Sequence, residues 1–179
     1  MYQSLYLTRS LNIVPGDSDL LTVYNAYLAW KRICNTTGAD YQFCRKNFLS
    51  PQTLSNIEDL KGQLIVSLVD SGFLLLTEAE RANLNNARFS SGRRQFFELP
   101  QRSNVNRDND LVTSSVIAWS FYPKLLTRDG KGWRNVANNQ SISVHPSSVN
   151  KGHNELNWLS YYHIMQAKQY VIFSIMKPS

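Results

Sequence analysis

The spacing of apolar residues changes once along this chain, near residue 122, and this change constrains the fold more than any other feature. Before that point, apolar residues recur at three- and four-residue steps, which is typical of amphipathic helices. After it, short runs alternate between apolar and polar residues and are separated by turn residues, which is typical of strands. We therefore expect an α+β fold, in which an N-terminal helical bundle is followed by a small five-stranded β-barrel.

Helices are expected over most of the first 120 residues. The predicted segments are Asp19–Cys34, Asp40–Phe48, a helix from Ser50-Pro51 to Ser71-Gly72, a short helix from Thr77, and Asp110–Ser120. Ser50-Pro51 is the clearest start, because a capping serine precedes a proline at the first helical position. Apolar residues are densest along the helix that follows, so we expect it to be the central scaffold, with Leu60 and Leu64 in the core.

Five short strands are expected after the last helix. They cover Lys124–Thr127, Trp133–Val136, Ser141–Val144, Trp158–Met165 and Gln169–Ile175. Upstream of them, Asn86–Asn109 holds five arginines and a lone apolar pair, Phe96-Phe97, and we expect a basic linker or a long surface loop there. The predicted domains are a helical module over residues 1–85, this linker over 86–109, and the barrel with its leading helix over 110–179.

The chain carries a net charge of +6, and the whole excess lies in its second half. Residues 1–85 hold seven Lys/Arg against eight Asp/Glu, whereas residues 86–179 hold twelve against five. A basic half beside a neutral one favours contact with a polyanion, of which nucleic acid is the commonest. A positive charge that serves solubility alone is the alternative that composition leaves open.

The sequence lacks the residue patterns that enzymes and metal sites require. It has no glycine-rich phosphate loop, and His145, His153 and His163 do not have metal-ligand spacing. Cys34 and Cys44 lie on apolar faces and are expected to be buried, inert thiols. We expect no catalytic residue, metal or cofactor in this chain. No apolar run approaches the roughly 20 residues that cross a bilayer, and no signal peptide is evident, so a cytoplasmic or nuclear location is expected.

Two separate motifs resemble the C-terminal region of DEAH/RHA-type ATP-dependent RNA helicases. The first is SDLLTVYNAY over residues 18–27, followed by Trp30 and by FCRKNFLS over residues 43–50. It resembles the helicase-associated, ratchet-like helices of that family. The second is VANNQSISVHPSSV over residues 136–149, which is similar to a segment of the family's oligonucleotide-binding (OB) barrel. Trp158, Tyr161-Tyr162 and Lys168-Gln169-Tyr170 resemble the strands that close that barrel.

The resemblance implies a ratchet-like helical module and an OB-type barrel from the accessory part of a helicase. Such a part would contribute non-sequence-specific single-stranded RNA binding and regulation of the motor. Because the motor motifs are absent, we expect an excised C-terminal fragment that is not itself an enzyme, and ATP and Mg²⁺ are implied only for the parent's motor. Expected partners are single-stranded or structured RNA, the parent's motor domains, and a ribosome or an activator protein; no membrane contact is expected.

Hydroxyl and basic side chains of the barrel half are the candidate RNA-binding residues, because such groups bind phosphates. They are Lys124, Arg128, Lys131, Arg134, His145, Ser147, Ser148 and Lys151. As an alternative, the His-Pro-Ser-Ser run is a turn whose hydroxyls cap backbone groups. Trp133 and Trp158 are expected in the core rather than as platforms for stacked bases. The alternative function is a protein-interaction module that binds a ribosomal or activator partner through the arginine-rich linker with Phe96-Phe97 and contacts RNA little.

Overall fold

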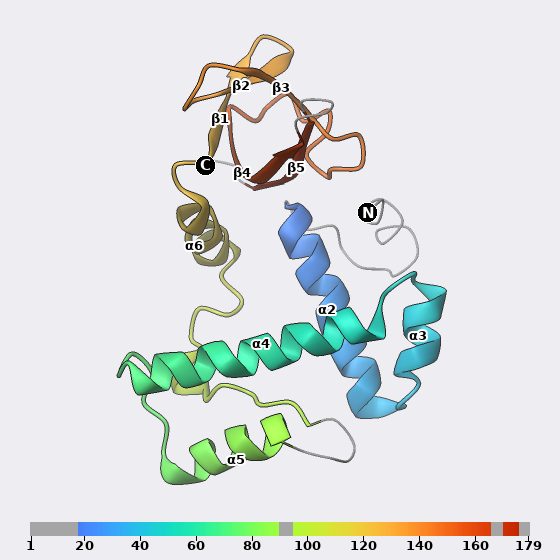
Figure 1. The fold of residues 1–179 in the computed structure, drawn as a ribbon, viewed down its shortest axis with the longest axis vertical. Coiled ribbons are helices and arrows are strands. Elements are labelled where there is room, and N and C mark those ends of the chain that lie inside the picture. Colours follow the sequence, from blue (N-terminus) through green and yellow to red (C-terminus); the bar gives the residue numbers. More distant parts are fainter. Residues whose placement is uncertain (1–17, 90–94, 166–169, 176–179) are drawn as a thin grey trace. The chain divides into compact units, whose positions relative to one another are not determined.

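The computed structural model describes residues 18–89, 95–165 and 170–175 (Figure 1). The chain divides into two compact units, which we call the barrel unit (Met1–Ala29 with Asn106–Ser179) and the helical unit (Trp30–Val105). The division falls inside helix α2 (Asp19–Thr36), so the first turns of that helix belong with the barrel. The predicted α+β class is confirmed. The domain limits at residues 85 and 109 stay a prediction.

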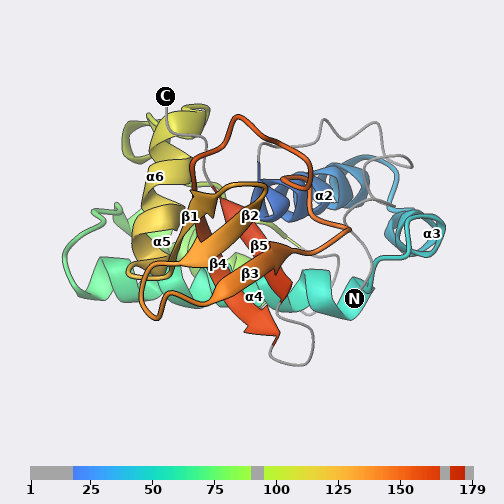
Figure 2. The same ribbon diagram turned by 90° about the horizontal axis from the view of Figure 1, so that it is seen from above.

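In the described part of the barrel unit, a sheet closes on itself in the order β1-β2-β3-β5-β4, and its strands curl around a common centre (Figure 1, Figure 2). The strands are β1 (Leu125–Asp129), β2 (Gly132–Asn135), β3 (Ser141–Val144), β4 (Trp158–Met165) and β5 (Tyr170–Ile175). Neighbouring strands are antiparallel except β3 and β5, which are parallel. Because β1 pairs with β4 as well as with β2, neither edge of β1 is left without a partner.

Alternation along these short strands directs one side of each into the barrel core. In β3, Ile142 and Val144 are buried while the two intervening serines are exposed. The core cluster also contains Leu126, Trp133, Leu156, Leu159 and Tyr161. Trp133 is buried, as expected, but Trp158 is 46% exposed, because it lies one residue before the inward-facing Leu159 and so points to the other side of β4. The expected core position of Trp158 is therefore wrong.

Helix α6 (Asp110–Phe121) leads into the barrel and packs beside β4 and β5 (Figure 2). The helix begins after Asn109, whose side-chain oxygen accepts a hydrogen bond from the Val112 N–H at 3.1 Å. An asparagine at this position satisfies one of the backbone donors that a helix start leaves without a partner. The change from a polar to an apolar run at residue 110 therefore coincides with the start of the helix.

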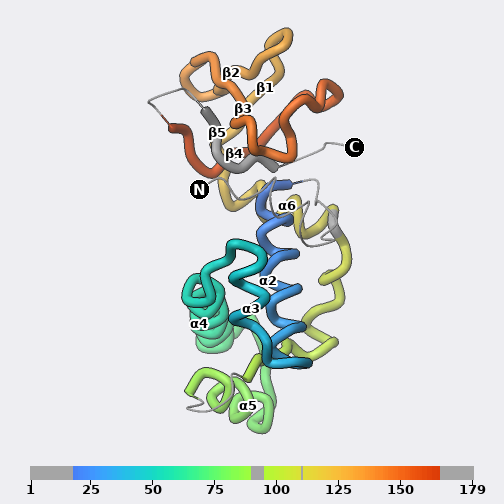
Figure 3. Tube along the Cα trace, turned by 90° about the vertical axis from the view of Figure 1, so that its right-hand side faces the viewer, coloured from blue at the N-terminus to red at the C-terminus, as the bar shows by residue number. Residues whose placement is uncertain are grey.

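The helical unit is built around α4 (Pro51–Asp70), which packs against α3 (Asp40–Lys46) and α5 (Glu78–Phe89) (Figure 3). The start of α4 is the predicted one, because Ser50 Oγ accepts from the Thr53 N–H at 3.2 Å and Pro51 is the first helical residue. Before α5, Thr77 and Glu80 form a reciprocal capping box. The Thr77 N–H donates to Glu80 Oε2 at 2.8 Å, and the Glu80 N–H donates to Thr77 Oγ1 at 3.3 Å.

The buried face of α4 differs from the one that the leucine spacing predicts. The buried residues are Leu54, Glu58, Gly62, Ile65 and Val69. Leu60 and Leu64 are 54% and 57% exposed, so their expected core positions are wrong. Successive helical residues are rotated by about 100°, and apolar residues occur around much of this helix. Periodicity alone therefore could not select the face that meets the rest of the unit.

Residues 86–89 and 95–105 of the predicted linker belong to the helical unit, and residues 106–109 belong to the barrel unit. Helix α5 continues to Phe89, residues 90–94 lie outside the described residues, and Phe97 is 7% exposed in a cluster with Ile65 and neighbouring apolar side chains. Arg102 donates two hydrogen bonds to the Glu80 carboxylate, at 2.7 and 2.5 Å. This arginine and the Thr77 N–H lower the pKa of Glu80 to about 2.

Candidate nucleic-acid interface

The eight candidate RNA-binding residues all belong to the barrel unit, where they lie at three places. Lys124 precedes β1, three cations surround the β1–β2 hairpin, and the remaining four residues follow β3. The three hairpin cations are Arg128, Lys131 and Arg134, and the four residues after β3 are His145, Ser147, Ser148 and Lys151. The contacts of each residue show whether its side chain is used within the fold or is accessible to a ligand.

At the hairpin, both arginines bind neighbouring protein groups. The Arg128 guanidinium lies 4.3 Å from the centroid of the Trp133 ring, and its Nε donates to a backbone carbonyl of the loop before β4 at 3.1 Å. Arg134 forms an ion pair with Asp129, with its Nε 2.9 Å from Oδ2. Lys131 lies between these strands in the two-residue loop and is exposed. Lys131 is therefore the hairpin cation with the best access to a phosphate.

The segment after β3 is fastened by a buried carboxylate from the first turn of α2. Asp19 is 2% exposed and accepts hydrogen bonds from Ser148 Oγ at 2.7 Å and from the Val149 N–H at 2.9 Å. Hydrogen bonds to an ionised group are roughly twice as strong as neutral ones. Ser148 is itself 7% exposed. Its hydroxyl is therefore used within the fold, and the bond joins the two sequence motifs that resemble helicases.

The rest of the His-Pro-Ser-Ser run forms a turn, as the alternative interpretation expects. His145 Nδ1 lies 2.6 Å from Ser147 Oγ and accepts from the Ser147 N–H at 3.2 Å. The Ser148 N–H donates to the His145 carbonyl oxygen at 3.0 Å. His145 and Ser147 are half-buried, whereas Lys151 at the end of the segment is exposed. Of the four candidates in this segment, Lys151 is thus the most accessible to a phosphate.

A pocket of about 490 Å³ opens on the barrel unit beside Lys124. The end of β2, the turn after it and the middle of β4 contribute Asn135, Asn138, Gln140, Tyr161 and Tyr162 to its lining. Lys124 Nζ donates to the Tyr162 carbonyl oxygen at 3.1 Å and lies 5.8 Å from the centroid of the Tyr162 ring. The pocket therefore combines a cation, an aromatic ring and side-chain amides.

Sequence reasoning found Lys124 but missed the other residues of this pocket. Asn138 and Gln140 lie in a turn, whereas Tyr162 lies on β4, so no local spacing relates them. The feature of the sequence that could have indicated this pocket is the Tyr161-Tyr162 pair within a predicted strand. Because successive strand residues point to opposite sides, one tyrosine of such a pair must lie on the outer surface. Tyr161 is 8% exposed and Tyr162 is 54% exposed.

No group of three or more His, Cys, Asp or Glu side chains among the described residues is placed to hold a metal ion. Cys34 and Cys44 are free thiols. Cys44 is buried, and burial raises its pKa, so this thiol stays protonated and unreactive near neutral pH. Cys34 is only half-buried, whereas a buried thiol was expected there. No helix within residues 18–89, 95–165 and 170–175 is long and apolar enough to span a bilayer.

Comparison with known proteins finds a family match in the barrel. Residues 113–177 match the family described as "Oligonucleotide/oligosaccharide-binding (OB)-fold". The match covers most of α6 and the five strands whose closed order is given above. The family assignment and the observed strand pairing therefore agree on the same part of the chain.

Relatives are similar over most of the chain's length. The "ATP-dependent RNA helicase DHX29" of Homo sapiens is 32% identical over 83% of this chain and 11% of its own length. The "ATP-dependent DNA/RNA helicase DHX36" of Bos taurus is 30% identical over 90% of this chain and 15% of its own length. The "Putative ATP-dependent RNA helicase DHX57" of Mus musculus is 31% identical over 69% of this chain and 9% of its own length. The chain thus spans a small part of each relative.

Proposed function

We propose that this chain is an accessory part of a helicase. It corresponds to the OB-fold region of DEAH-type RNA helicases. In this proposal it binds single-stranded RNA without sequence preference and regulates the motor of its parent protein. The OB fold is a barrel on which oligonucleotides are commonly bound. The relatives' names describe ATP-dependent helicases, so ATP and Mg²⁺ act, in this proposal, in motor domains of the parent chain.

The observation that carries the proposal is the placement of three exposed lysines on the barrel unit. Lys124, Lys131 and Lys151 lie at three separate connections of this one barrel. A lysine binds phosphate as a flexible point charge and does not read the base, which suits binding without sequence preference. The second half of the chain also holds twelve basic residues against five acidic ones. Phosphate contacts of this kind release counterions and make affinity depend on salt.

The alternative, a protein-interaction module, is weakened by the surroundings of Phe96-Phe97. Phe97 is buried in the helical unit, and Phe96 packs edge-on against Trp30 with 5.7 Å between ring centroids. Lys31 Nζ lies 5.2 Å from the centroid of the Phe96 ring, and Lys31 also pairs with Glu98. A partner could not use this pair as an anchor without breaking those contacts. We therefore do not extend the proposal to a ribosomal or activator partner.

The test measures RNA affinity as salt is raised, using fluorescence anisotropy of labelled twelve-nucleotide oligouridine. The triple variant Lys124→Gln, Lys131→Gln, Lys151→Gln should bind more weakly, and the slope of log K against log salt should fall by about 0.7 for each lost phosphate contact. These side chains are exposed, so the fold should survive, which circular dichroism checks. Arg128 and Arg134 are left intact because their contacts hold the hairpin.

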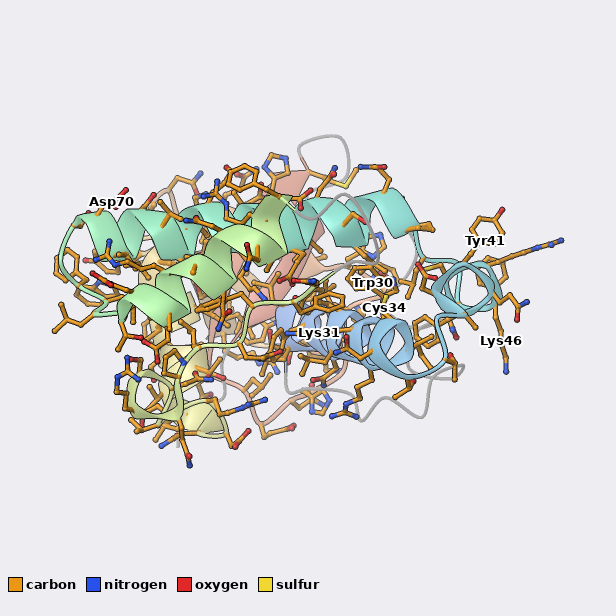
Figure 4. The ribbon with its side chains drawn as sticks, turned by 90° about the horizontal axis from the view of Figure 1, so that it is seen from below. Trp30, Lys31, Cys34, Tyr41, Lys46 and Asp70 are labelled. Atoms are coloured by element: carbon orange, nitrogen blue, oxygen red, sulfur yellow. The ribbon has the colours of Figure 1, made fainter. Side chains whose placement is uncertain are left out.

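The matched control removes three exposed cations from the helical unit, with Arg32→Gln, Arg45→Gln and Lys46→Gln. Figure 4 shows Lys46 directed outward from α3. The control variant should keep almost the whole salt slope of the unmodified chain. If the control loses the slope while the barrel variant keeps it, the barrel is not the RNA-binding unit.

In a separate assay we expect no ATP hydrolysis by the chain alone, and RNA-stimulated hydrolysis by the purified chain would contradict this.

A further inference from the structure

We propose that the pocket beside Lys124 receives one base of a single RNA strand, with the Tyr162 ring as its stacking surface. This inference rests on the proposed function and deepens it. It assigns contact with a base to an aromatic residue and two amide side chains, which the search for phosphate-binding residues does not find. The pocket volume of about 490 Å³ is within the range of small-ligand sites, which is roughly 300–1,000 Å³. Such a pocket has room for a base with its ribose.

The floor of the pocket is held in place by buried hydrogen bonds. Asn135 is 4% exposed, and its Nδ2 donates to the Tyr161 hydroxyl at 3.1 Å. The Asn135 side-chain oxygen accepts from the Ala137 N–H at 3.0 Å, which fixes the start of the following turn. Both residues face the pocket from strands that are paired on the closed sheet. Because these floor residues are already ordered, little conformational entropy is lost there when a ligand binds.

The Tyr162 ring is accessible, with Phe121 against it in an edge arrangement and the Lys124 ammonium over one of its faces, so the base stacks on the face that Lys124 does not cover. Tyr162 is 54% exposed, and the Phe121 ring meets it with 5.8 Å between centroids. Lys124 Nζ lies over the ring, 5.8 Å from its centroid, and donates to the Tyr162 carbonyl oxygen in an exposed hydrogen bond that a phosphate can replace. A ring held in this way loses little freedom when a base stacks on it. Stacking on an aromatic side chain is available to every base, so it adds affinity without sequence preference.

The rim supplies polar groups that suit a nucleotide better than an apolar peptide. Asn138 and Gln140 are exposed, and the Gln140 N–H donates to Asn138 Oδ1 at 3.1 Å, which holds the turn. Side-chain amides offer both donors and acceptors to a base edge or a ribose hydroxyl. Lys124 supplies a positive charge for the adjacent phosphate. Among the described residues that line the pocket, none is acidic, so nothing there repels a phosphate.

The experiment compares two labelled strands of equal length, twelve-nucleotide oligouridine and an abasic ribose-phosphate strand, over the same salt series. Tyr162→Ala should weaken oligouridine binding by about 5- to 150-fold, the range for losing one stacked base. The salt slope should stay unchanged, because no phosphate contact is removed. Binding of the abasic strand should be unaffected. Tyr162→Phe should retain affinity, since it keeps the ring, and Tyr41→Ala, at an exposed tyrosine of the helical unit, is the matched control (Figure 4).

Several outcomes would overturn the inference. Unchanged oligouridine affinity in Tyr162→Ala, or an equal loss for both strands, would exclude base stacking at this pocket. If Tyr162→Ala fails to fold, the double variant Asn138→Ala, Gln140→Ala replaces it, and it should weaken oligouridine binding by about 3- to 10-fold while sparing the abasic strand. If the unmodified chain binds neither strand in a salt-dependent way, the proposed function itself fails. If both strands bind equally well to every variant, the proposed function stands and the pocket is left to another ligand, such as a protein side chain.

Discussion

Replacing Asp19 with alanine should destabilise the barrel unit by removing one carboxylate that serves two donors. Asp19 accepts from Ser148 Oγ at 2.7 Å and from the Val149 N–H at 2.9 Å, and both Asp19 and Ser148 are buried. The alanine variant leaves both donors without this partner. A buried donor left unsatisfied costs about 1–3 kcal/mol, which applies to the Ser148 hydroxyl, whereas the part-buried Val149 N–H costs less. The expected loss is therefore about 2–4 kcal/mol, a large part of the roughly 5–15 kcal/mol that stabilises a typical domain.

Thermal unfolding followed by circular dichroism measures this loss. For a chain of this size, 1 kcal/mol lowers the midpoint by about 2–4 °C, so Asp19→Ala should lower it by roughly 4–16 °C. Asp19→Asn should cost less, because the amide oxygen can still accept from the Val149 N–H while the charge is lost. The matched control is Asp108→Ala, since the Asp108 side chain is 91% exposed and should contribute within about 0.5 kcal/mol of zero.

A double-mutant cycle separates this bond from general disturbance of the barrel. If Asp19 and Ser148 act through their hydrogen bond, Ser148→Ala should cost much less in the Asp19→Ala background than in the unmodified chain. The coupling free energy should be about 0.5–3 kcal/mol. Additive effects of the two substitutions, or an unchanged midpoint in Asp19→Ala, would refute the reasoning that this carboxylate fastens the segment after β3.

Three further predictions concern other parts of the fold. Ile65→Ala should cost about 2–5 kcal/mol and Leu64→Ala about 0.5 kcal/mol or less, because the first side chain is buried and the second exposed, as urea unfolding can verify. The pKa of Glu80 is lowered from 4.5 to about 2. The stability that Glu80→Gln removes should therefore be fully present above pH 4.5 and vanish as pH falls towards about 2. Thermal midpoints of the unmodified chain and the variant, measured across this pH range, check this. Arg128→Lys should lower the midpoint because an ammonium cannot both stack on an indole and keep the guanidinium's hydrogen bonds, whereas Lys131→Arg should leave it unchanged.

Features that depend on residues close together in the chain could be predicted from the sequence. Ser50-Pro51 begins α4 as predicted, and a helix follows Thr77 with its capping glutamate three residues later. The α+β class followed from one change in apolar spacing. Caps and strand alternation involve neighbours within four residues, so local chemistry determines them in any surrounding fold. The resemblance to helicases also rested on short motifs, and the comparisons confirm it.

Features that depend on packing were decided by the tertiary structure. The buried face of α4 contains Gly62, where an added Cβ would lie 3.1 Å from the Arg88 side chain of α5, and it is this face, not the one bearing Leu64, that packs within the unit. Asp19 and Ser148 are 129 residues apart, and nothing near either residue in the chain identifies its partner. Ser148, a predicted phosphate ligand, is a buried donor to Asp19 in the structure. A hydroxyl suits both uses equally, and only its burial beside the Asp19 carboxylate, which comes from a distant helix, decides between them.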